Sequence, residues 1–408
     1  MPPAISDVGP RRERTVFLVA GELSGDALGA ELMAALSAAG ADRVCFLGVG
    51  GPLMEARGLR SLFPLSDVAV MGIGAILARL PQLLRRVRQT VDAAITAKPD
   101  VVVIIDSPEF THPIARRLRR RCPDIPIIDY VSPSVWAWRS GRAPRMRAYV
   151  DHVLALLPFE PAEYTRLGGP PCTYVGHPLI ERLEWIADLD PAPLAQRLGL
   201  SATQPVLVVL PGSRRSEVER LAAVFGATIE RLMQQGMTPQ VIVPTIGHVR
   251  DLVASRVAAW PIAPHLVSDE TDKWRAFKLA RAALAASGTV ALELGLAGTP
   301  MVVGYKVDAV LAFFVRRMAT ATTIILPNLI LGRNVFREYV QEDCTADRLA
   351  AALADVMTDG PTRKSQLSAL SELPGRMHIP EGTPSEFAGR IVWNYADRAR
   401  ILPTKGRS

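Results

Sequence analysis

Short runs of β-branched residues alternate with Ala- and Leu-rich segments along almost the whole chain. Val101 to Ile105 is the clearest such run, and Asp26 to Ala38 has the composition of a helix. This alternation predicts an α/β fold with doubly wound parallel sheets, whose ligands bind outside the carboxyl ends of the strands. Polar residues that directly follow the strands are therefore the candidates for function. The predicted strands are 15–20, 44–48, 101–105, 125–130, 153–157, 205–209, 240–244, 265–267, 282–286 and 301–305.

The chain is long enough for more than one domain, because its 408 residues exceed the roughly 100 to 200 of a typical domain. Strand character is lost over residues 180–204, where prolines stand among acidic residues, so the interdomain connection is placed there. We predict one domain over residues 1–185, a second over 186–380, and a C-terminal helix and tail over 381–408 that can return to the first domain. Two Rossmann-like domains would face each other across a cleft.

The net charge of +7 favours phosphorylated substrates, an anionic membrane surface or nucleic acid as partners. Basic runs are not interleaved with aromatic residues, so we expect no nucleic acid partner. The four cysteines lie far apart without metal-ligand spacing, which predicts no metal site, no disulfide framework and a reducing compartment. The polar N-terminus is not a signal peptide, and no apolar run approaches the roughly 20 residues of a membrane-spanning helix. These features predict a cytoplasmic protein.

The stretch Leu210 to Glu219 follows a predicted strand and opens a predicted helix. Ser216 and Glu219 have the spacing of a capping box, so we expect the helix to begin at Ser216 with its free N–H groups directed back toward the turn. Gly212 and Ser213 would let a phosphate approach the backbone, and the guanidinium of Arg214 suits a diphosphate. An ordinary strand-to-helix turn with surface arginines is the alternative.

A second turn of the same kind follows the predicted strand 282–286. Ser287, Gly288 and Thr289 would hold phosphate oxygens at a helix start, and Glu293 would accept two ribose hydroxyls. Helix capping with an acid at the favourable end of the helix dipole is the alternative for this turn alone. Together the two turns favour a nucleotide diphosphate site.

In the first half, Asp106 closes the strand 101–105 and is a candidate general base toward a sugar hydroxyl. A simple turn before Ser-Pro is the alternative. The segment after the first strand matches neither a dinucleotide-binding fingerprint nor a P-loop. It supplies Glu22 as a second candidate acid. Candidate acceptor-binding residues, for which helix capping and core packing are the alternatives, are Ser24, Gly25, Asp26, Trp136 and Trp138.

Two stretches combine apolar and basic residues. The first covers residues 68–91 and the second 310–318. Such segments lie on an anionic membrane or pack an apolar stripe against the core, and the residues alone favour core packing for the first.

Taken together, these motifs resemble those of the lipid-A-disaccharide synthases, a family of bacterial glycosyltransferases. They follow the family order along nearly the whole chain, and the run from Tyr130 to Trp138 is the most specific. The matching segments are Ala20-Gly21-Glu22, Ser24-Gly25-Asp26, Leu28-Gly29, Gly48 to Gly51 with Met54, Asp106-Ser107-Pro108, Tyr130 to Trp138, Gly176-His177-Pro178, Leu210 to Arg214 with Ser216-Glu217, Ala286 to Thr289 with Glu293, Pro300 to Tyr305, and Leu326 to Leu329.

The resemblance implies a B-type glycosyltransferase fold, with the sugar nucleotide bound by the C-terminal domain and the acceptor by the N-terminal domain. The implied reaction joins UDP-2,3-diacylglucosamine to 2,3-diacylglucosamine 1-phosphate through a β-1,6 bond, with inversion and without cofactor or metal. It implies Asp106 as the base, and it adds Asn328 to the uridine diphosphate site formed by Arg214, Ser287 to Thr289 and Glu293. It also implies that the enzyme works at the inner face of the cytoplasmic membrane. For the segment 68–91, the resemblance therefore favours membrane contact over core packing. A homodimer is left open.

The chain departs from the family pattern in two places. After Asp106 the family usually has Ala-Pro-Asp-Phe-Asn, whereas this chain has Ser107 to Thr111 with Glu109 as the second acid, and Arg337-Glu338 replaces a Pro-Glu pair. A UDP-sugar epimerase or hydrolase on the same fold is the alternative enzyme. A non-enzymatic binding protein would lack the candidate base.

Overall fold

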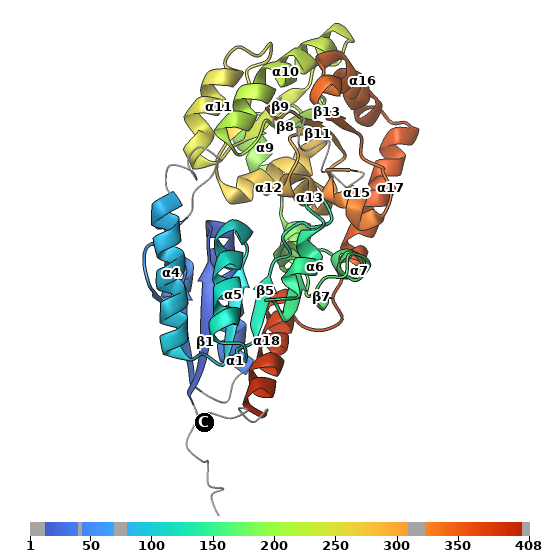
Figure 1. Ribbon diagram of the computed structural model, residues 1–408. Coiled ribbons are helices and arrows are strands. Elements are labelled where there is room, and N and C mark those ends of the chain that lie inside the picture. Colours follow the sequence, from blue (N-terminus) through green and yellow to red (C-terminus); the bar gives the residue numbers. More distant parts are fainter. Residues whose placement is uncertain (1–12, 40–42, 69–79, 309–322, 402–408) are drawn as a thin grey trace, which may run out of the picture. The chain divides into compact units, whose positions relative to one another are not determined.

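The computed structural model describes residues 13–39, 43–68, 80–308 and 323–401 and divides the chain into two compact units. Unit 1 comprises residues 1–178 and 379–408, and unit 2 comprises residues 179–378. The chain thus passes from unit 1 to unit 2 after residue 178 and returns to unit 1 after residue 378. The boundaries predicted from the sequence were after residues 185 and 380. Each unit is a parallel sheet covered by helices, as the alternation of strands and helices predicted (Figure 1).

Unit 1 contains a seven-stranded sheet in the order β3-β2-β1-β4-β5-β6-β7, and all its pairings are parallel. Its strands are β1 (Glu13–Ala20), β2 (Arg43–Val49), β3 (Arg60–Ser61), β4 (Val101–Ile105), β5 (Ile127–Tyr130), β6 (His152–Ala155) and β7 (Cys172–Tyr174). Its helices are α1 (Leu23–Ala39), α2 (Pro52–Ala56), α4 (Leu80–Ala97), α5 (Pro108–Arg121), α6 (Arg142–Met146), α7 (Glu160–Arg166) and α18 (Pro384–Ile401).

Both faces of this sheet are covered, which explains why β4 is β-branched throughout. Val102 and Ile104 point into a core shared with α4 and α5, and Val101, Val103 and Ile105 point into a core shared with α1 and α18. Trp393 of α18 packs in the second core, and its indole N–H donates to the carbonyl oxygen of Leu36 at 3.3 Å. The C-terminal helix therefore belongs to the unit in which the described chain begins.

Unit 2 contains a six-stranded parallel sheet in the order β10-β9-β8-β11-β12-β13. Its strands are β8 (Val206–Leu210), β9 (Gln240–Pro244), β10 (His265–Val267), β11 (Ala280–Ala285), β12 (Met301–Tyr305) and β13 (Glu338–Val340). Its helices are α8 (Leu183–Asp188), α9 (Ala192–Leu198), α10 (Arg215–Gln234), α11 (Arg250–Val257), α12 (Glu270–Leu279), α13 (Thr289–Leu296), α15 (Leu326–Leu331), α16 (Ala346–Met357) and α17 (Pro361–Arg376).

All the predicted strands are present, and the differences lie in short elements. The strands β3, β7 and β13, of two or three residues each, were not predicted because they are too short to show a periodic pattern. Residues 180–204, predicted as a connection, form α8 and α9 and belong to unit 2. In the part of the chain that the structure describes, every helix is too short or too polar to cross a bilayer.

Candidate functional site

A pocket of about 510 Å³ lies in unit 2 where the loops leave the carboxyl ends of four neighbouring strands, β10, β9, β8 and β11. It brings together the two turns that the sequence singled out, although more than 70 residues separate them along the chain. Its lining residues are Leu210, Gly212, Ser213, Arg214, Glu217, Pro244, Thr245, Ile246, Ser268, Asp269, Glu270, Lys273, Ala286, Ser287, Gly288, Thr289, Val290 and Glu293. We call it the carboxyl-edge pocket.

The first turn differs in detail from the expectation. Helix α10 begins at Arg215, so the predicted start at Ser216 and the predicted Ser216–Glu219 capping box are wrong. Glu217 takes the capping role instead, because its Oε2 accepts hydrogen bonds from the backbone N–H groups of Ser213 at 3.0 Å and Arg214 at 3.3 Å. Glu219 pairs with Arg215 on the surface at 3.3 Å.

This arrangement changes what the first turn offers to an anion. The backbone N–H groups of Ser213 and Arg214 are already engaged by Glu217. The side chain of Arg214 is 59% exposed, and among the described residues it bonds only through Nη1, at 3.0 Å from Glu217 Oε1. The hydroxyl of Tyr305 also donates to Glu217 Oε1, at 3.4 Å. The remaining guanidinium donors of Arg214 are therefore the groups available to a diphosphate.

The second turn presents an open helix start. Gly288 has φ +145° and ψ −162°, a conformation that is essentially restricted to glycine, and α13 begins at the next residue, Thr289. Gly288 and Thr289 are exposed, and α13 has no side-chain cap. Ser287 Oγ anchors the turn by donating to the carbonyl oxygen of Ile324 at 3.1 Å. The N–H groups at this helix start and its dipole can therefore hold an anion.

An acid and a lysine form the third part of the pocket. Lys273 Nζ lies 3.0 Å from Glu293 Oε1 and 3.4 Å from Glu270 Oε2. Burial raises the pKa of Glu293, and the ammonium of Lys273 offsets part of the rise. The carboxylate oxygens here can accept hydrogen bonds from vicinal hydroxyls. Sequence reasoning missed Lys273 and Glu270, because only the tertiary fold brings these residues of α12 to Glu293 of α13.

Thr245 is a further lining residue that the sequence did not single out. It follows β9, is 8% exposed, and its Oγ1 has no hydrogen-bond partner among the described residues. Ile246 beside it leaves 43% of its surface exposed. A buried hydroxyl without a partner next to an exposed apolar side chain can accept a flat, polar-edged group. No sequence motif marks this position.

The structure does not bring Asn328 into this pocket. Asn328 is 2% exposed, its Oδ1 accepts from the N–H groups of Val335 and Phe336 at 2.9 and 3.0 Å, and its Nδ2 donates to the Phe336 carbonyl oxygen at 2.8 Å. A fourth contact joins Nδ2 to Thr323 Oγ1 at 3.3 Å. The side chain therefore holds together the segment around α15.

In unit 1, Asp106 lies at the carboxyl end of β4 with a left-handed φ of +54°. Its Oδ1 accepts from the N–H of Ser107 at 2.7 Å, and its Oδ2 accepts from Ser24 Oγ at 3.1 Å. Ser24 is in the first turn of α1, so the structure brings two predicted residues together. Glu22, on the adjoining loop, forms no hydrogen bond or ion pair through its carboxylate with any described residue. Asp106 remains partly exposed and can reach a substrate hydroxyl.

Asp26 and Gly25 are directed into unit 1. Asp26 is 1% exposed and accepts from the backbone N–H groups of Gly51 at 2.8 Å, Met54 at 3.0 Å and Leu53 at 3.1 Å, so it caps the start of α2. Gly25 is buried against β4, where a Cβ would lie 3.3 Å from the Ile105 carbonyl oxygen. These two predicted acceptor-binding residues therefore serve the packing around the site.

The two tryptophans of the specific run have different surroundings. Trp136 Nε1 donates to Glu160 Oε1 at 3.0 Å, and its ring packs edge-on against Phe159 at 5.2 Å. Burial raises the pKa of Glu160 to about 7. Trp138 is 40% exposed, and the guanidinium of Arg139 lies 4.3 Å from its ring centroid. Trp138 is the tryptophan that a substrate can contact.

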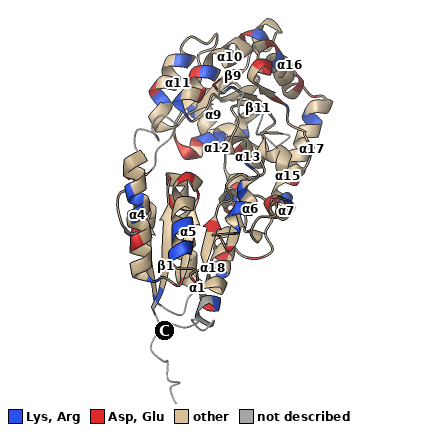
Figure 2. Cartoon of the chain, viewed as in Figure 1, with Lys and Arg blue, Asp and Glu red and all other residues tan. Residues whose placement is uncertain are grey.

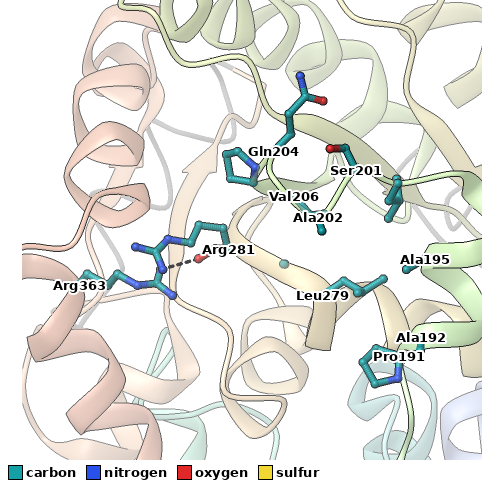
Figure 3. A pocket seen from close by; sticks show the side chains of 13 residues that line it. Pro191, Ala192, Ala195, Ser201, Ala202, Gln204, Val206, Leu279, Arg281 and Arg363 are labelled. Carbon is teal, nitrogen blue, oxygen red and sulfur yellow. Dashed lines mark hydrogen bonds between the residues drawn. The ribbon is translucent and has the colours of Figure 1, made fainter.

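A second cavity in unit 2, of about 570 Å³, lies at the opposite ends of the strands, beside the first residues of β8 and β11 (Figure 3). Arg363 at its edge donates to the carbonyl oxygen of Arg281 at 2.6 Å, and apolar side chains from α9 and β8 form much of the wall. No carboxylate is among its lining residues. Glu293, the acid expected for the ribose hydroxyls, lines the carboxyl-edge pocket and not this cavity.

Comparison with known proteins gives concordant results. The family model described as lipid-A-disaccharide synthetase matches residues 16–373. Among similar curated proteins, the lipid-A-disaccharide synthase of Rhodopseudomonas palustris (strain HaA2) is 53% identical over 381 residues, covering 93% of this chain and 96% of that protein. The enzyme of the same name from Rhodospirillum centenum is 44% identical over 399 residues, covering 96% and 99%.

Solved structures show the same fold at low identity. The S. aureus MnaA–UDP co-structure has a TM-score of 0.62 at 13% identity, covering 96% of this chain and 99% of that one. The Acinetobacter baumannii MurG structure has a TM-score of 0.56 at 13% identity, covering 93% and 99%. The fold is therefore that of the B-type glycosyltransferases.

Proposed function

Because the chain belongs to the lipid-A-disaccharide synthase family and is thus a glycosyltransferase with that activity, we propose how its two units divide the reaction. Unit 2 binds UDP-2,3-diacylglucosamine, and unit 1 binds 2,3-diacylglucosamine 1-phosphate. The 6-hydroxyl oxygen of the acceptor attacks the anomeric carbon of the donor as the bond to UDP breaks. The product is a β-1,6 disaccharide 1-phosphate with inverted anomeric configuration.

One observation carries the donor half of this proposal: the carboxyl-edge pocket gathers an arginine, an open helix start and a buried acid within one cavity of unit 2. The guanidinium of Arg214 and the turn from Ser287 to Thr289 receive the diphosphate. Glu293 accepts the ribose hydroxyls, with Lys273 holding its carboxylate in place. Gly212 and Ser213 line the pocket beside Arg214.

The same groups assist the departure of UDP. Negative charge develops on the diphosphate oxygen as the glycosidic bond breaks, and fixed positive charge and dipoles stabilise that charge without reorganising. Arg214 and the start of α13 are already in position, because Glu217 fixes the first turn and Ser287 anchors the second. They take the part that a bound cation plays in other transferases.

Asp106 is the general base for the acceptor. Its carboxylate takes the proton of the attacking 6-hydroxyl, while Ser24 and the N–H of Ser107 fix its orientation. Glu22, on the loop that leaves the neighbouring strand β1, is the second acid near this hydroxyl. Trp138 offers an exposed aromatic face to the acceptor.

The direct test is to incubate the purified chain with both acylated substrates in detergent and to detect the disaccharide by mass. An epimerase or hydrolase on the same fold would convert the donor without needing the acceptor, so free acylated glucosamine or an epimer in place of disaccharide would refute the proposal. The similarity to UDP-N-acetylglucosamine 2-epimerase structures concerns the fold alone.

For the membrane, the proposal rests on the described part of the segment 68–91. In α4, Val87 and Val91 pack into the core, whereas Leu80 and Leu84 are each 41% exposed beside the exposed Arg85. Figure 2 shows basic residues on α4 and on α5. Residues 69–79 and the second stretch, 310–318, lie outside the described residues. Flotation with phosphatidylglycerol vesicles, compared with phosphatidylcholine vesicles, tests the contact with an anionic membrane, and sedimentation tests the homodimer.

A further inference from the structure

Two arginines in unit 1 share one carboxylate oxygen. Glu109 Oε1 lies 2.6 Å from Arg142 Nη2 and 3.4 Å from Arg139 Nη1. The Arg142 side chain is 15% exposed, whereas those of Arg139 and Glu109 are 48% and 62% exposed. Although burial raises the pKa of Glu109, the two arginines outweigh it and hold that pKa below its ordinary value. The trio carries one surplus positive charge, and several guanidinium donors are not used by Glu109.

The trio adjoins the candidate base. Strands β4 and β5 pair in parallel, with Ile105 opposite Tyr130, and the N–H of Asp106 donates to the Tyr130 carbonyl oxygen at 3.0 Å. The loops after both strands therefore leave the same edge of the sheet. Glu109 is three residues beyond Asp106, so their Cα atoms are at most about 11 Å apart. A sugar whose hydroxyl meets Asp106 can place a substituent on its far side near the arginines.

Backbone strain is concentrated in these two loops. Seven described non-glycine residues have positive φ, and five of them lie in the two loops: Asp106, Ser107, Val131, Ser134 and Arg139. Such backbone conformations are unfavourable for residues with a side chain, and strain of this kind collects at ligand sites where the surrounding structure enforces it. Arg139 itself has φ +52°, so its backbone is held in an unusual conformation.

The arginine with the strained backbone is also oriented by an aromatic ring. Its guanidinium lies 4.3 Å from the ring centroid of Trp138, which is 40% exposed. Stacking on a ring fixes the plane of the guanidinium and reduces the freedom lost when it binds a planar or tetrahedral anion. The cluster is thus a preorganised pair of forked donors with an apolar surface beside it.

We propose that Arg139 and Arg142 bind the phosphate monoester on the anomeric carbon of the acceptor, and that Glu109 occupies the two arginines until this phosphate arrives. A phosphate carries a charge near −1.5 to −2 and three acceptor oxygens, so it displaces a single exposed carboxylate from two guanidiniums. The assignment rests on the proposed function, since Asp106 fixes the 6-hydroxyl and the phosphate lies across the same sugar ring.

The experiment compares two acceptors, 2,3-diacylglucosamine 1-phosphate and 2,3-diacylglucosamine, with saturating donor in detergent. For each protein the readout is the ratio of kcat/KM for the phosphorylated acceptor to that for the unphosphorylated one. This ratio is independent of the fraction of active enzyme, so partial misfolding of a variant does not change it. The proteins are the wild type, Arg139→Ala, Arg142→Ala, Arg142→Lys and Arg145→Ala; Arg145 is an exposed residue of α6 with no contact to Glu109.

We expect the ratio to fall about ten- to a hundredfold in each of the two alanine variants, as the loss of charge-assisted hydrogen bonds implies. Arg142→Lys should fall between wild type and Arg142→Ala, and Arg145→Ala should keep the wild-type ratio. An unchanged ratio in both alanine variants would overturn the assignment, as would a wild type that does not distinguish the acceptors. Wild type that makes no disaccharide from either acceptor would instead contradict the proposed function.

A lipid headgroup offers the same phosphate chemistry, so a second measurement separates the two sources. The same variants are tested for binding to vesicles containing phosphatidylglycerol. If the arginines bind membrane phosphates, the variants will lose vesicle binding while the acceptor ratio stays at the wild-type value, and the assignment to the acceptor is wrong. We expect vesicle binding to change no more in Arg139→Ala and Arg142→Ala than in Arg145→Ala.

Discussion

The carboxyl edges of the two sheets achieve their sharp turns in different ways. In unit 2 the turns next to the pocket use glycine, with Gly212 at φ +124° and Gly288 at φ +145°. In unit 1 the corresponding turns use residues with side chains, among them Asp106 at φ +54° and Val131 at φ +85°. We call the two turns at the pocket the nucleotide edge and the loops after β4 and β5 the acceptor edge. The turns of the nucleotide edge are relaxed, whereas the loops of the acceptor edge are strained.

This difference follows from what each edge has to present. In the proposed reaction a diphosphate is bound by backbone groups and an arginine, so small residues that let it approach are sufficient. The acceptor edge presents side chains, above all the carboxylate of Asp106, at the turn itself, and glycine cannot supply them. Strain at unit 1 is thus the cost of placing a functional side chain where the chain reverses.

The largest effect is expected at Asp106. Asp106→Asn should lower kcat by roughly 10² to 10⁴, because the amide cannot take the proton of the attacking hydroxyl. The affinity for UDP, measured by calorimetry, should stay within about twofold, since the donor site in unit 2 is untouched. Wild-type turnover in this variant would show that Asp106 is not the base. It would also contradict the explanation that the strain at the acceptor edge serves to present this carboxylate.

At the nucleotide edge, Arg214→Ala should weaken UDP binding about ten- to a hundredfold, because the available guanidinium donors are lost. Arg215→Ala is the matched control, since its side chain is 73% exposed and pairs with Glu219. The control should bind UDP within about twofold of the wild type. Equal UDP affinity in both variants would place the diphosphate elsewhere.

A buried acid behind the acceptor loop predicts a pH dependence. Glu160 is 3% exposed, and burial raises its pKa from 4.5 to about 7. The folded state therefore binds this proton more tightly than the unfolded state, and the resulting stability is present below pH 4.5 and is lost as the pH rises through 7. Glu160→Gln should reduce the fall in unfolding free energy across this window by up to about 3 kcal/mol, measured by urea denaturation. A profile parallel to that of the wild type would contradict the raised pKa.

The requirement for glycine at the nucleotide edge can be tested by replacing Gly288 with alanine, which adds one methyl group. Gly288→Ala should lower the free energy of unfolding by about 1–3 kcal/mol and weaken UDP binding, because alanine is strained at φ +145° although its Cβ meets no atom within 4 Å. Gly247→Ala is the control in the same unit, with equally open space and no left-handed backbone. Similar stability of the two variants would show that the turn is not restricted to glycine.

The smallest effect is expected from the reverse change at the acceptor edge. Ser134→Gly should leave the unfolding free energy unchanged or raise it by up to about 1 kcal/mol, because glycine relieves the strain at φ +32° while adding freedom to the unfolded chain. Urea denaturation checks this directly. A clear loss of stability would mean that the Ser134 backbone is not under strain and that the two edges do not differ as described.

This contrast also explains what the sequence could predict. The two glycine-containing turns of unit 2 were recognised because Gly before a helix start has a clear sequence signature, and they do meet in one pocket. The left-handed residues of unit 1 have no such signature, since Val131 and Arg139 look like ordinary loop residues. Long strands such as β4 were placed correctly because their burial on both faces makes them β-branched throughout.

Other misses have a tertiary cause. Lys273 reaches Glu293 only because the fold brings α12 and α13 to the same pocket, and Asp26 is directed into the unit because the backbone N–H groups at the start of α2 lie within its reach. At the first turn, Glu217 rather than Glu219 caps α10, because the helix begins one residue earlier than its Ser-x-x-Glu pattern indicated. Distances along the sequence do not contain this information.

The position of α18 has a consequence for how the protein is made. Its residues Ala388, Val392 and Trp393 complete the core formed by Leu32, Met33 and Leu36 of α1, yet they are translated only after the whole of unit 2. During translation, the N-terminal part of unit 1 therefore exposes a hydrophobic surface that is covered only when α18 has been synthesised. A premature stop codon between the end of unit 2 at His378 and the start of α18 at Pro384 leaves unit 2 complete and removes the helix that covers the core of the unit carrying Asp106.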